Sequence, residues 1–339
     1  GFMKTTNNKL QFDLQLKQKL DMITKGLSFK MKASYNGTYA INKNAYAKKA
    51  TYTPVLQDDG TYKYKKYGNE EQLKYEEKTG RSRYWYFEAG LKYNRSFGLN
   101  NVGAILLYNQ DSSYYPSTYT NVPHRQVGLV GRVTYDWNNR YMAEFNVGYN
   151  GSENFAPGKR YGTFPAMSVG WVVSDEPFFK PLTKAVSFLK LRASYGVTGQ
   201  QEGIGNYNYL PVYTYSVTGA EAFINGQYIN TYRPEAYVSD LKWETTTSWN
   251  FGLDFGFLNG RIGGAIDFYT RKTKDLLASV PTAAGTNFSK TILTNVGNVD
   301  SKGIEVSLNA TPIQTKDWEW NLSYNFTWQN MKVKNLSLT

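Results

Sequence analysis

The sequence has little of what catalytic and metal sites are made from. Its 339 residues include no cysteine and only one histidine, His124. Without cysteine there is no disulfide, no thiolate metal site and no cysteine nucleophile, and one histidine cannot form a histidine-rich metal centre. We therefore expect no catalytic residue, no metal site and no cofactor, and the chain is not predicted to be an enzyme.

Long apolar runs are missing as well, and charged residues are few. No apolar run reaches 18 residues, which excludes a transmembrane helix. Charged residues make up 19% of the chain and aromatic residues 16%, whereas soluble domains are about a quarter charged. This aromatic content excludes a disordered chain. The net charge of +12 is spread along the sequence without a recognition module, so no nucleic-acid partner is expected.

Apolar and polar residues alternate with a period of two along most of the chain, which predicts β-strands. Twelve stripes are found, at 10–16, 27–41, 85–93, 104–108, 127–137, 141–149, 167–171, 189–195, 249–257, 262–268, 304–310 and 318–328. Most indicate strands of about ten residues, which suits a tilted crossing of a bilayer, whereas globular strands are about five or six residues long. A β-sandwich also has one buried face per strand. Aromatic residues near the strand ends favour the membrane barrel: Trp137, Tyr141, Trp171, Trp318 and Trp328.

The predicted connections alternate between short and long. Two short ones contain Asn138-Asn139 and Asn259-Gly260, residues that suit the positive φ angles of two-residue hairpins. The long ones span about 43–82, 109–125, 151–163, 199–243 and 271–301. This alternation is typical of outer-membrane barrels, with short turns in the periplasm and long loops outside. One connection in a position where a short turn is expected, 174–188, is longer than the others. A helical turn is expected within it.

The even number of strands, together with the side on which the first turn lies, predicts that the chain is an internal piece of a larger barrel. If the turn at 21–26 is periplasmic, twelve strands place both chain ends on the extracellular side. Complete bacterial barrels normally keep both termini in the periplasm. We therefore expect further strands of the same barrel to lie outside this chain.

From about Tyr135 onward the residues resemble the SusC/RagA family of TonB-dependent outer-membrane transporters. The motifs that carry the resemblance are YDWNNRY at 135–141, GKRYGTFPAMSVGW at 158–171, SDEPFF at 174–179, LKLRASYG at 189–196, GQQ at 199–201, LKWE at 241–244, GLDFGFLNGR at 252–261, DFYTRKT at 267–273, NVGNV at 295–299 and KGIE at 302–305. Departures at Asn150, 151–155 and Ser301 affect turns and not the architecture. The first 130 residues fit the family by strand pattern only.

The resemblance implies an all-β fold, an antiparallel transmembrane β-barrel of about 22 strands, of which residues 1–339 supply about twelve as part of one domain. Its lumen would be filled by a plug outside this chain. Such proteins import glycans or peptides across the Gram-negative outer membrane, driven by TonB, with a SusD-like surface lipoprotein as a lid. Outer-membrane lipid and lipopolysaccharide are the expected surroundings. The alternatives are a scaffolding barrel without import and, less favoured, a soluble adhesin sandwich.

Clustered tyrosines in the long loops are the candidate contacts with ligand or lid. These candidates are Tyr114, Tyr115, Tyr207 and Tyr209, because aromatic side chains are favoured anchors at interfaces. Loop 43–82, rich in lysine and tyrosine, has two readings: contact with sugar or lid, or a solvated loop whose basic groups meet lipopolysaccharide. Its carboxylate pairs, such as Asp58-Asp59, are expected to be solvated surface.

Charged residues on the polar face of the strands are expected to line the lumen or contact the plug. They are Lys30, Lys32, Arg132, Glu144, Arg192 and Glu305. A charge that is buried in a plugged barrel needs a partner. The sequence alone does not assign the pairs.

Overall fold

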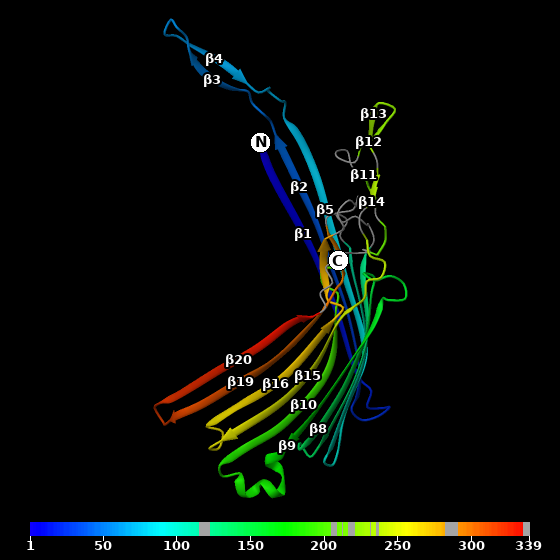
Figure 1. Cartoon of the computed structure of the whole chain (residues 1–339), viewed down its shortest axis with the longest axis vertical. Coiled ribbons are helices and arrows are strands. Elements are labelled where there is room, and N and C mark those ends of the chain that lie inside the picture. Colours follow the sequence, from blue (N-terminus) through cyan, green and yellow to red (C-terminus); the bar gives the residue numbers. More distant parts are fainter. Residues whose placement is uncertain are drawn as a thin grey trace. The chain divides into compact units, whose positions relative to one another are not determined.

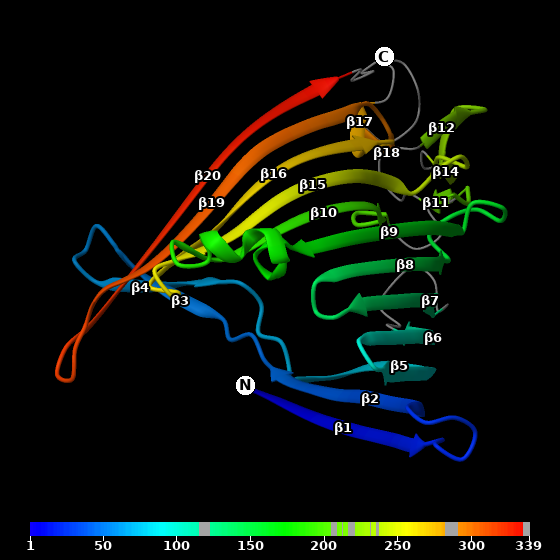
Figure 2. The ribbon, with the colours of Figure 1, turned by 90° about the horizontal axis from the view of Figure 1, so that it is seen from below.

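A computed structural model describes residues 1–114, 123–204, 209–211, 213–215, 221–230, 232–234, 237–281 and 291–334, with the backbone alone at 213–215, 221–224, 228–230 and 232–234. Twelve long strands form one antiparallel sheet (Figures 1 and 2). In sheet order they are β1 (Phe2–Lys19), β2 (Leu27–Tyr46), β5 (Lys74–Phe97), β6 (Asn100–Tyr114), β7 (His124–Trp137), β8 (Tyr141–Ser152), β9 (Tyr161–Val172), β10 (Val186–Gln200), β15 (Glu244–Phe257), β16 (Ile262–Lys274), β19 (Asn298–Gln314) and β20 (Glu319–Lys334). The predicted all-β fold of twelve long strands is confirmed.

The chain divides into two compact parts, which we describe separately. The first comprises Gly1–Gln15, Lys32–Phe87 and Asp111–His124, and the second contains the remaining residues. In the first part, two side-chain hydrogen bonds join β1 to β2. Gln11 Nε2 donates to Asn36 Oδ1 at 3.0 Å, and Ser34 Oγ donates to Asp13 Oδ1 at 2.5 Å.

Several long connections contain hairpins of their own. β3 (Thr51–Leu56) pairs with β4 (Tyr62–Tyr67) in the first part of the chain. In the second part β11 (Tyr213–Tyr215) pairs with β14 (Tyr232–Pro234), β12 (Glu221–Ile224) with β13 (Gln227–Asn230), and β17 (Leu277–Pro281) with β18 (Thr291–Asn295). β5 also begins at Lys74, well inside the predicted loop 43–82. Residues 74–82 are polar on both faces, so they carry no apolar stripe that could indicate a strand.

The short turns have the backbone that their sequences predict. Asn138 and Asn139 both have a φ of 55°, and Asn259 has a φ of 56°. The turns are longer than the two residues predicted: the turn between β7 and β8 has three, because Trp137 pairs with Tyr141, and the turn between β15 and β16 has four, because Phe257 pairs with Ile262. The Asn139 N–H donates to Asp136 Oδ1 at 3.0 Å, which fixes the turn.

The connection between β9 and β10 contains two short 3₁₀ helices, η1 (Val173–Asp175) and η2 (Pro177–Leu182), as the sequence predicts. Pro177 opens η2, where its fixed φ suits the first helical position. In the ranges that the structure describes, no helix is long and apolar enough to cross a membrane.

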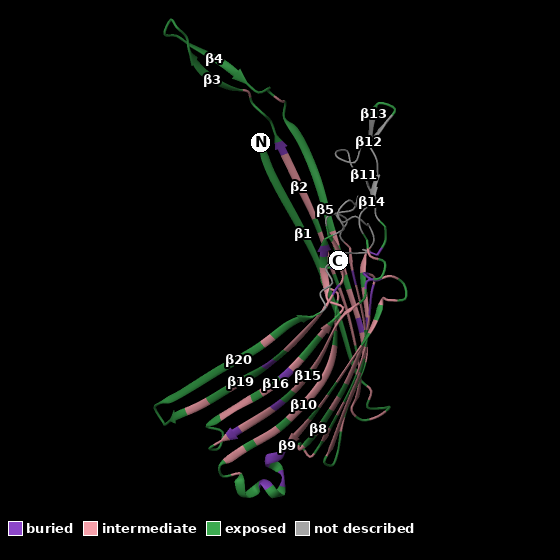
Figure 3. Cartoon of the chain, in the orientation of Figure 1, coloured by how far each residue is buried: buried purple, intermediate pink, exposed green. Residues whose placement is uncertain are grey.

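The sheet has one apolar face that no second layer of the described residues covers. Register aligns the stripes across it, so that Leu191 pairs with Leu253 and Leu253 with Ile266. Val169 is 58% exposed on this face, and the long strands are mostly exposed or intermediate (Figure 3). Among the described residues, only Phe155 and Leu241 are large side chains with less than 2% exposure. A sandwich would bury its apolar faces against one another, so this sheet does not form one.

The left-handed backbone at Asn139 gives a test of the fold. Asn139→Val should destabilise the β7–β8 hairpin by roughly 1–2 kcal/mol, because a β-branched residue fits positive φ poorly. We expect a smaller folded fraction of the full-length protein in detergent, measured by the shift in gel mobility between folded and boiled samples. Asn139→Gly, which accepts positive φ, is the control and should fold as the parent does. Equal folding of the valine variant would contradict the role of this turn.

Candidate functional site

The polar face of the sheet centres on Arg192 of β10. Its Nε and Nη2 donate to the two carboxylate oxygens of Asp254 on β15, at 2.8 and 2.7 Å. Nη2 also donates to Asp267 Oδ2 on β16, at 3.1 Å. A bidentate contact of this kind fixes geometry as well as adding energy. Arg192 therefore ties together three neighbouring strands.

Gly252 makes room for this arrangement. It is the cross-strand partner of both Arg192 and Asp267. A Cβ at Gly252 would lie 2.6 Å from Arg192 Cζ, a distance that real Cβ contacts do not show. The glycine lets the guanidinium lie flat across β15 and reach β16.

Further charges continue along the same face. Glu305 is the register partner of Asp267, so three carboxylates and one guanidinium occupy adjacent strands. Arg132 pairs with Glu144 at 2.7 Å, and Lys30 pairs with Glu88 at 2.6 Å. The sequence predicted the face of these residues, and the structure supplies charged partners for Lys30, Arg132 and Arg192. Asp254 and Asp267 follow the same polar phase, so the alternation in the sequence could have identified them too.

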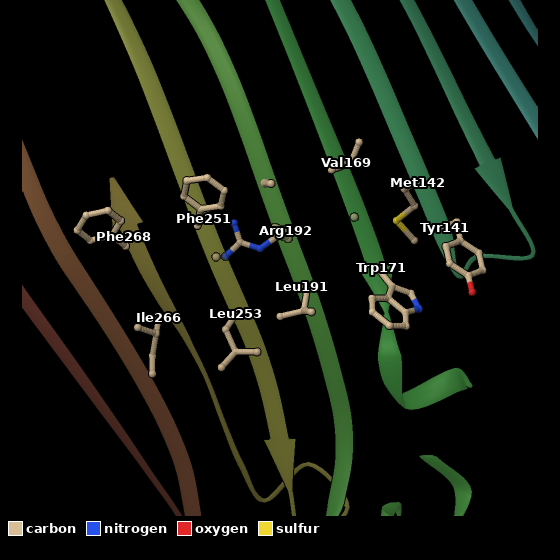
Figure 4. A pocket seen from close by; sticks show the side chains of 13 residues that line it. Tyr141, Met142, Val169, Trp171, Leu191, Arg192, Phe251, Leu253, Ile266 and Phe268 are labelled. Atoms are coloured by element: carbon tan, nitrogen blue, oxygen red, sulfur yellow. The ribbon is translucent and has the colours of Figure 1, made fainter. Parts of the chain in front are cut away.

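Two hollows flank Arg192 on opposite faces. One of about 470 Å³ is lined by polar groups that include Glu144, Lys190, Ser194 and Asn250. The other, of about 770 Å³, is an apolar groove lined chiefly by aromatic and aliphatic side chains (Figure 4). Within the described ranges, no group of three or more acidic or histidine side chains is placed to hold a metal ion.

At the end of the sheet with short turns, Glu176 joins three of the sequence motifs. It is buried between η1 and η2 and accepts hydrogen bonds from Tyr141 Oη, from Trp171 Nε1 at 3.0 Å and from Arg140 Nη1 at 3.2 Å. These groups come from YDWNNRY, from the end of β9 and from SDEPFF. The Tyr141 and Trp171 hydrogen bonds and the Arg140 charge hold the pKa of the Glu176 carboxyl below its usual value of 4.5.

At the other end, the long connections of the second part share a small apolar core. Phe155, Ile204 and Leu241 form it, with Val238, Trp243, Leu277 and Leu293 packed against them. The Phe155 and Trp243 rings lie 4.7 Å apart. Three connections therefore meet here: β8–β9, β10–β15, and the β17–β18 hairpin between β16 and β19.

Half-buried polar groups complete this loop core. Arg160 Nε donates to the Phe155 carbonyl oxygen at 3.2 Å, and Trp243 Nε1 donates to the Arg160 carbonyl oxygen at 3.2 Å. Asn295 Nδ2 donates to the Lys242 and Asp275 carbonyl oxygens at 3.0 and 2.8 Å. The motifs GKRYG, LKWE and NVGNV supply these groups, so their side chains hold the connections together.

The four predicted contact tyrosines have different surroundings. Tyr114 is half-buried, with the Arg83 guanidinium 4.7 Å from its ring centre. Tyr209 is buried, and its Oη accepts a hydrogen bond from Arg160 Nη2 at 3.0 Å, so it belongs to the loop core. Tyr115 and Tyr207 lie outside the described residues. Contact of these tyrosines with a ligand or lid stays a prediction.

Comparison with known proteins decides the family. The family model described as TonB dependent receptor-like, beta-barrel matches residues 2–338. The chain belongs to this family. Its members are outer-membrane β-barrels and transporters rather than enzymes, and the resemblance predicted from the sequence is confirmed.

Two curated receptors and one solved structure show the extent of the likeness. The chain is 46% identical over 211 residues to the TonB-dependent receptor SusC of Bacteroides thetaiotaomicron, covering 62% of this chain and 21% of that receptor. It is 32% identical over 259 residues to the TonB-dependent receptor P39 of Formosa agariphila, covering 75% and 24%. A structure of the RagAB peptide transporter matches with a TM-score of 0.75 at 21% identity, over 98% of this chain and 37% of that one. The last match shows the fold alone. The chain spans about a quarter or less of the two receptors.

Glu176 gives a pH-dependent test of the motif cluster. Because its pKa is lowered on folding, its ionised form stabilises the receptor above about pH 4.5, and this contribution is lost as the pH falls through the lowered pKa. Glu176→Gln should unfold at a lower urea concentration than the parent at pH 7, and the difference should shrink at about pH 3.5. The exposed neighbour variant Asp175→Asn is the control. A Glu176→Gln variant with the parent's midpoint at pH 7 would contradict the cluster.

Leu241 tests the loop core. It is 1% exposed, and Leu241→Ala should destabilise the packed connections by about 2–5 kcal/mol, since a cavity replaces the side chain. Chymotrypsin, which cuts after aromatic residues, should then cleave near Trp243 faster than in the parent. Lys242→Ala removes an exposed neighbouring side chain and should leave the cleavage rate unchanged. The same rate in both variants would mean that Leu241 does not support the core.

Proposed function

We propose that this chain forms part of the wall of an outer-membrane importer for glycans or peptides. The observation that carries the proposal is the two-faced sheet, with an exposed apolar side and a charged side tied together by Arg192. Membrane barrels place an apolar face against lipid and a polar face toward the lumen. A likeness to SusC and the fold of RagAB, a peptide transporter, support import as the activity.

The two edges of the sheet support a larger barrel. β1 pairs only with β2 and β20 only with β19 in the sheet order, so each edge leaves a long row of main-chain groups unmatched within the described sheet. Unpaired main-chain N–H and C=O groups are costly in hydrocarbon, so membrane-spanning sheets close. We expect strands outside this chain to pair with both edges and complete a barrel of about 22 strands.

The charged face supports a plug in the lumen. The carboxylates Asp254, Asp267 and Glu305 outnumber the cations Lys190 and Arg192 by one on adjacent strands. The plug, outside this chain, would contact this face, and a TonB-binding segment next to it would receive the energy for import. The long loops would then lie outside the cell and the short turns in the periplasm.

The β3–β4 hairpin has the form of a docking surface for a SusD-like lipoprotein. Tyr62 and Tyr64 lie on one side of it and are 65% and 66% exposed, whereas Lys63 and Lys65 lie on the other. An isolated two-stranded hairpin is only marginally stable in water, and exposed aromatic residues are frequent interface anchors. The tyrosine side would contact the lipoprotein, and the lysine side would face lipopolysaccharide.

Substitutions on the two sides of the hairpin test which side contacts the lipoprotein. Tyr62→Ser with Tyr64→Ser should lower the amount of surface lipoprotein that co-purifies with the full-length receptor by about tenfold, since removing two anchors costs more than about 1.4 kcal/mol. Lys63→Gln with Lys65→Gln is the matched control and should retain the lipoprotein. Equal retention by both double variants would contradict docking through the tyrosine side.

Import itself is tested in the native host. Cells that lack the full-length receptor should lose uptake of either fluorescent oligosaccharides or fluorescent peptides, and the cargo that is lost identifies the substrate class. Removal of the TonB-binding segment should abolish the same uptake without loss of the folded barrel. Unchanged uptake of both cargoes, with the lipoprotein still bound, would instead indicate a scaffolding barrel.

A further inference from the structure

The connection between β9 and β10 places buried and exposed apolar side chains within a few residues of one another. Val173, Glu176 and Phe179 are buried, whereas Phe178 and Leu182 are 65% and 55% exposed. An isolated exposed apolar residue is ordinary. Here two large ones lie within the six residues of η2, at the end of the sheet with short turns.

The segment has a fixed conformation. The Phe179 N–H donates to the Glu176 carbonyl oxygen at 3.0 Å, and the Ala185 N–H donates to the Leu182 carbonyl oxygen at 3.0 Å. Thr183 Oγ1 donates to the Lys180 carbonyl oxygen at 2.8 Å. Together with the Glu176 cluster, these bonds hold Phe178 and Leu182 outward.

The exposed side chains continue the apolar face of the sheet. The Phe178 ring meets the Trp171 ring edge-on, with their centres 6.5 Å apart. Trp171 lines the apolar groove of about 770 Å³, together with Leu191, Leu253 and Ile266 (Figure 4). An apolar surface therefore runs from the middle of the strands past their ends and onto η2.

Positive charge accompanies this apolar surface. Lys180 and Lys184 are both exposed and lie two residues from Leu182 on either side. Asp175 is the one exposed acidic residue between Val172 and Val186, and the buried Glu176 carboxylate is paired with Arg140, so the exposed charges of the connection sum to plus one. Apolar side chains next to lysine are typical of segments that lie in the headgroup region of a bilayer.

We propose that residues 177–184 bind an anionic phospholipid of the leaflet that faces the short turns. Phe178 and Leu182 would enter the boundary between headgroups and acyl chains, Lys180 and Lys184 would bind the phosphate, and an acyl chain would lie in the groove beside Trp171. The proposal rests on the placement of the sheet in the outer membrane. It adds a lipid site that fixes the depth of this end of the wall.

Site-specific fluorescence tests the depth, and the lack of cysteine in the chain makes single labels possible. Leu182→Cys, Val169→Cys and Asp58→Cys are each labelled with an environment-sensitive fluorophore in the full-length receptor, with any cysteine outside this chain replaced by serine. The proteins are reconstituted in phosphatidylethanolamine and phosphatidylglycerol vesicles that contain a nitroxide lipid. Leu182 should be quenched by a nitroxide near the headgroup at least twofold more than Asp58, which lies at the tip of the β3–β4 hairpin.

Val169 separates the two proposals. It lies on the apolar face of the strands, so a nitroxide deep in the bilayer should quench its label. If Val169 is quenched and Leu182 behaves like Asp58, the lipid site is wrong while the barrel wall stands. If Val169 is not quenched, the proposed placement in the membrane fails.

The charge requirement has its own measurement. Lys180→Gln with Lys184→Gln should reduce the phosphatidylglycerol that stays bound to the receptor in native mass spectrometry by at least twofold, with phosphatidylethanolamine unchanged. The matched control is Lys242→Gln with Lys274→Gln, two exposed lysines at the end of the sheet with long connections. Equal phosphatidylglycerol retention in the two double variants would overturn the role of the two lysines.

Discussion

Main-chain pairing between neighbouring strands is the interaction on which the rest of this structure depends. Within the residues that the structure describes, only Phe155 and Leu241 are large and almost fully buried, so the sheet has almost no core of its own. Each long strand is therefore held by its ladder of hydrogen bonds. The ladder also sets the register, and a slip of one residue would turn every side chain to the other face. Arg192 would then point toward the apolar side and lose both aspartates.

The side-chain clusters can be understood as fixing that register. At one end, Glu176 joins the β7–β8 turn, the end of β9 and the two 3₁₀ helices. At the other end, Arg160 and Asn295 join connections far apart in sequence. Between them, Arg192 crosses β15 over Gly252 to reach β16. The motifs that resemble the family thus supply the contacts that hold neighbouring strands in place.

The sequence predicted the features that depend on local chemistry. Alternation located the twelve strands, and the asparagine pair at 138–139 marked a turn with positive φ. It did not predict which charges pair, because alternation reports the face of a residue and not its neighbour on the next strand. Residues 74–82 were missed as strand because they are polar on both faces. The burial of Tyr209 depends on Arg160, 49 residues away, and nothing in the local sequence indicates it.

The charge balance of the polar face constrains what can lie against it. Lys190 and Arg192 neutralise at most two of the carboxylates Asp254, Asp267 and Glu305, which occupy neighbouring strands. Covering this face with an apolar surface would remove water from the remaining carboxylate, a cost that these two cations do not offset. Whatever fills the space in front of the sheet must therefore bring water or positive charge to this position. The apolar face, in contrast, needs an apolar surface such as lipid in front of it. The register of the strands therefore gives one sheet a polar face and an apolar face, as a wall between lipid and a polar lumen requires.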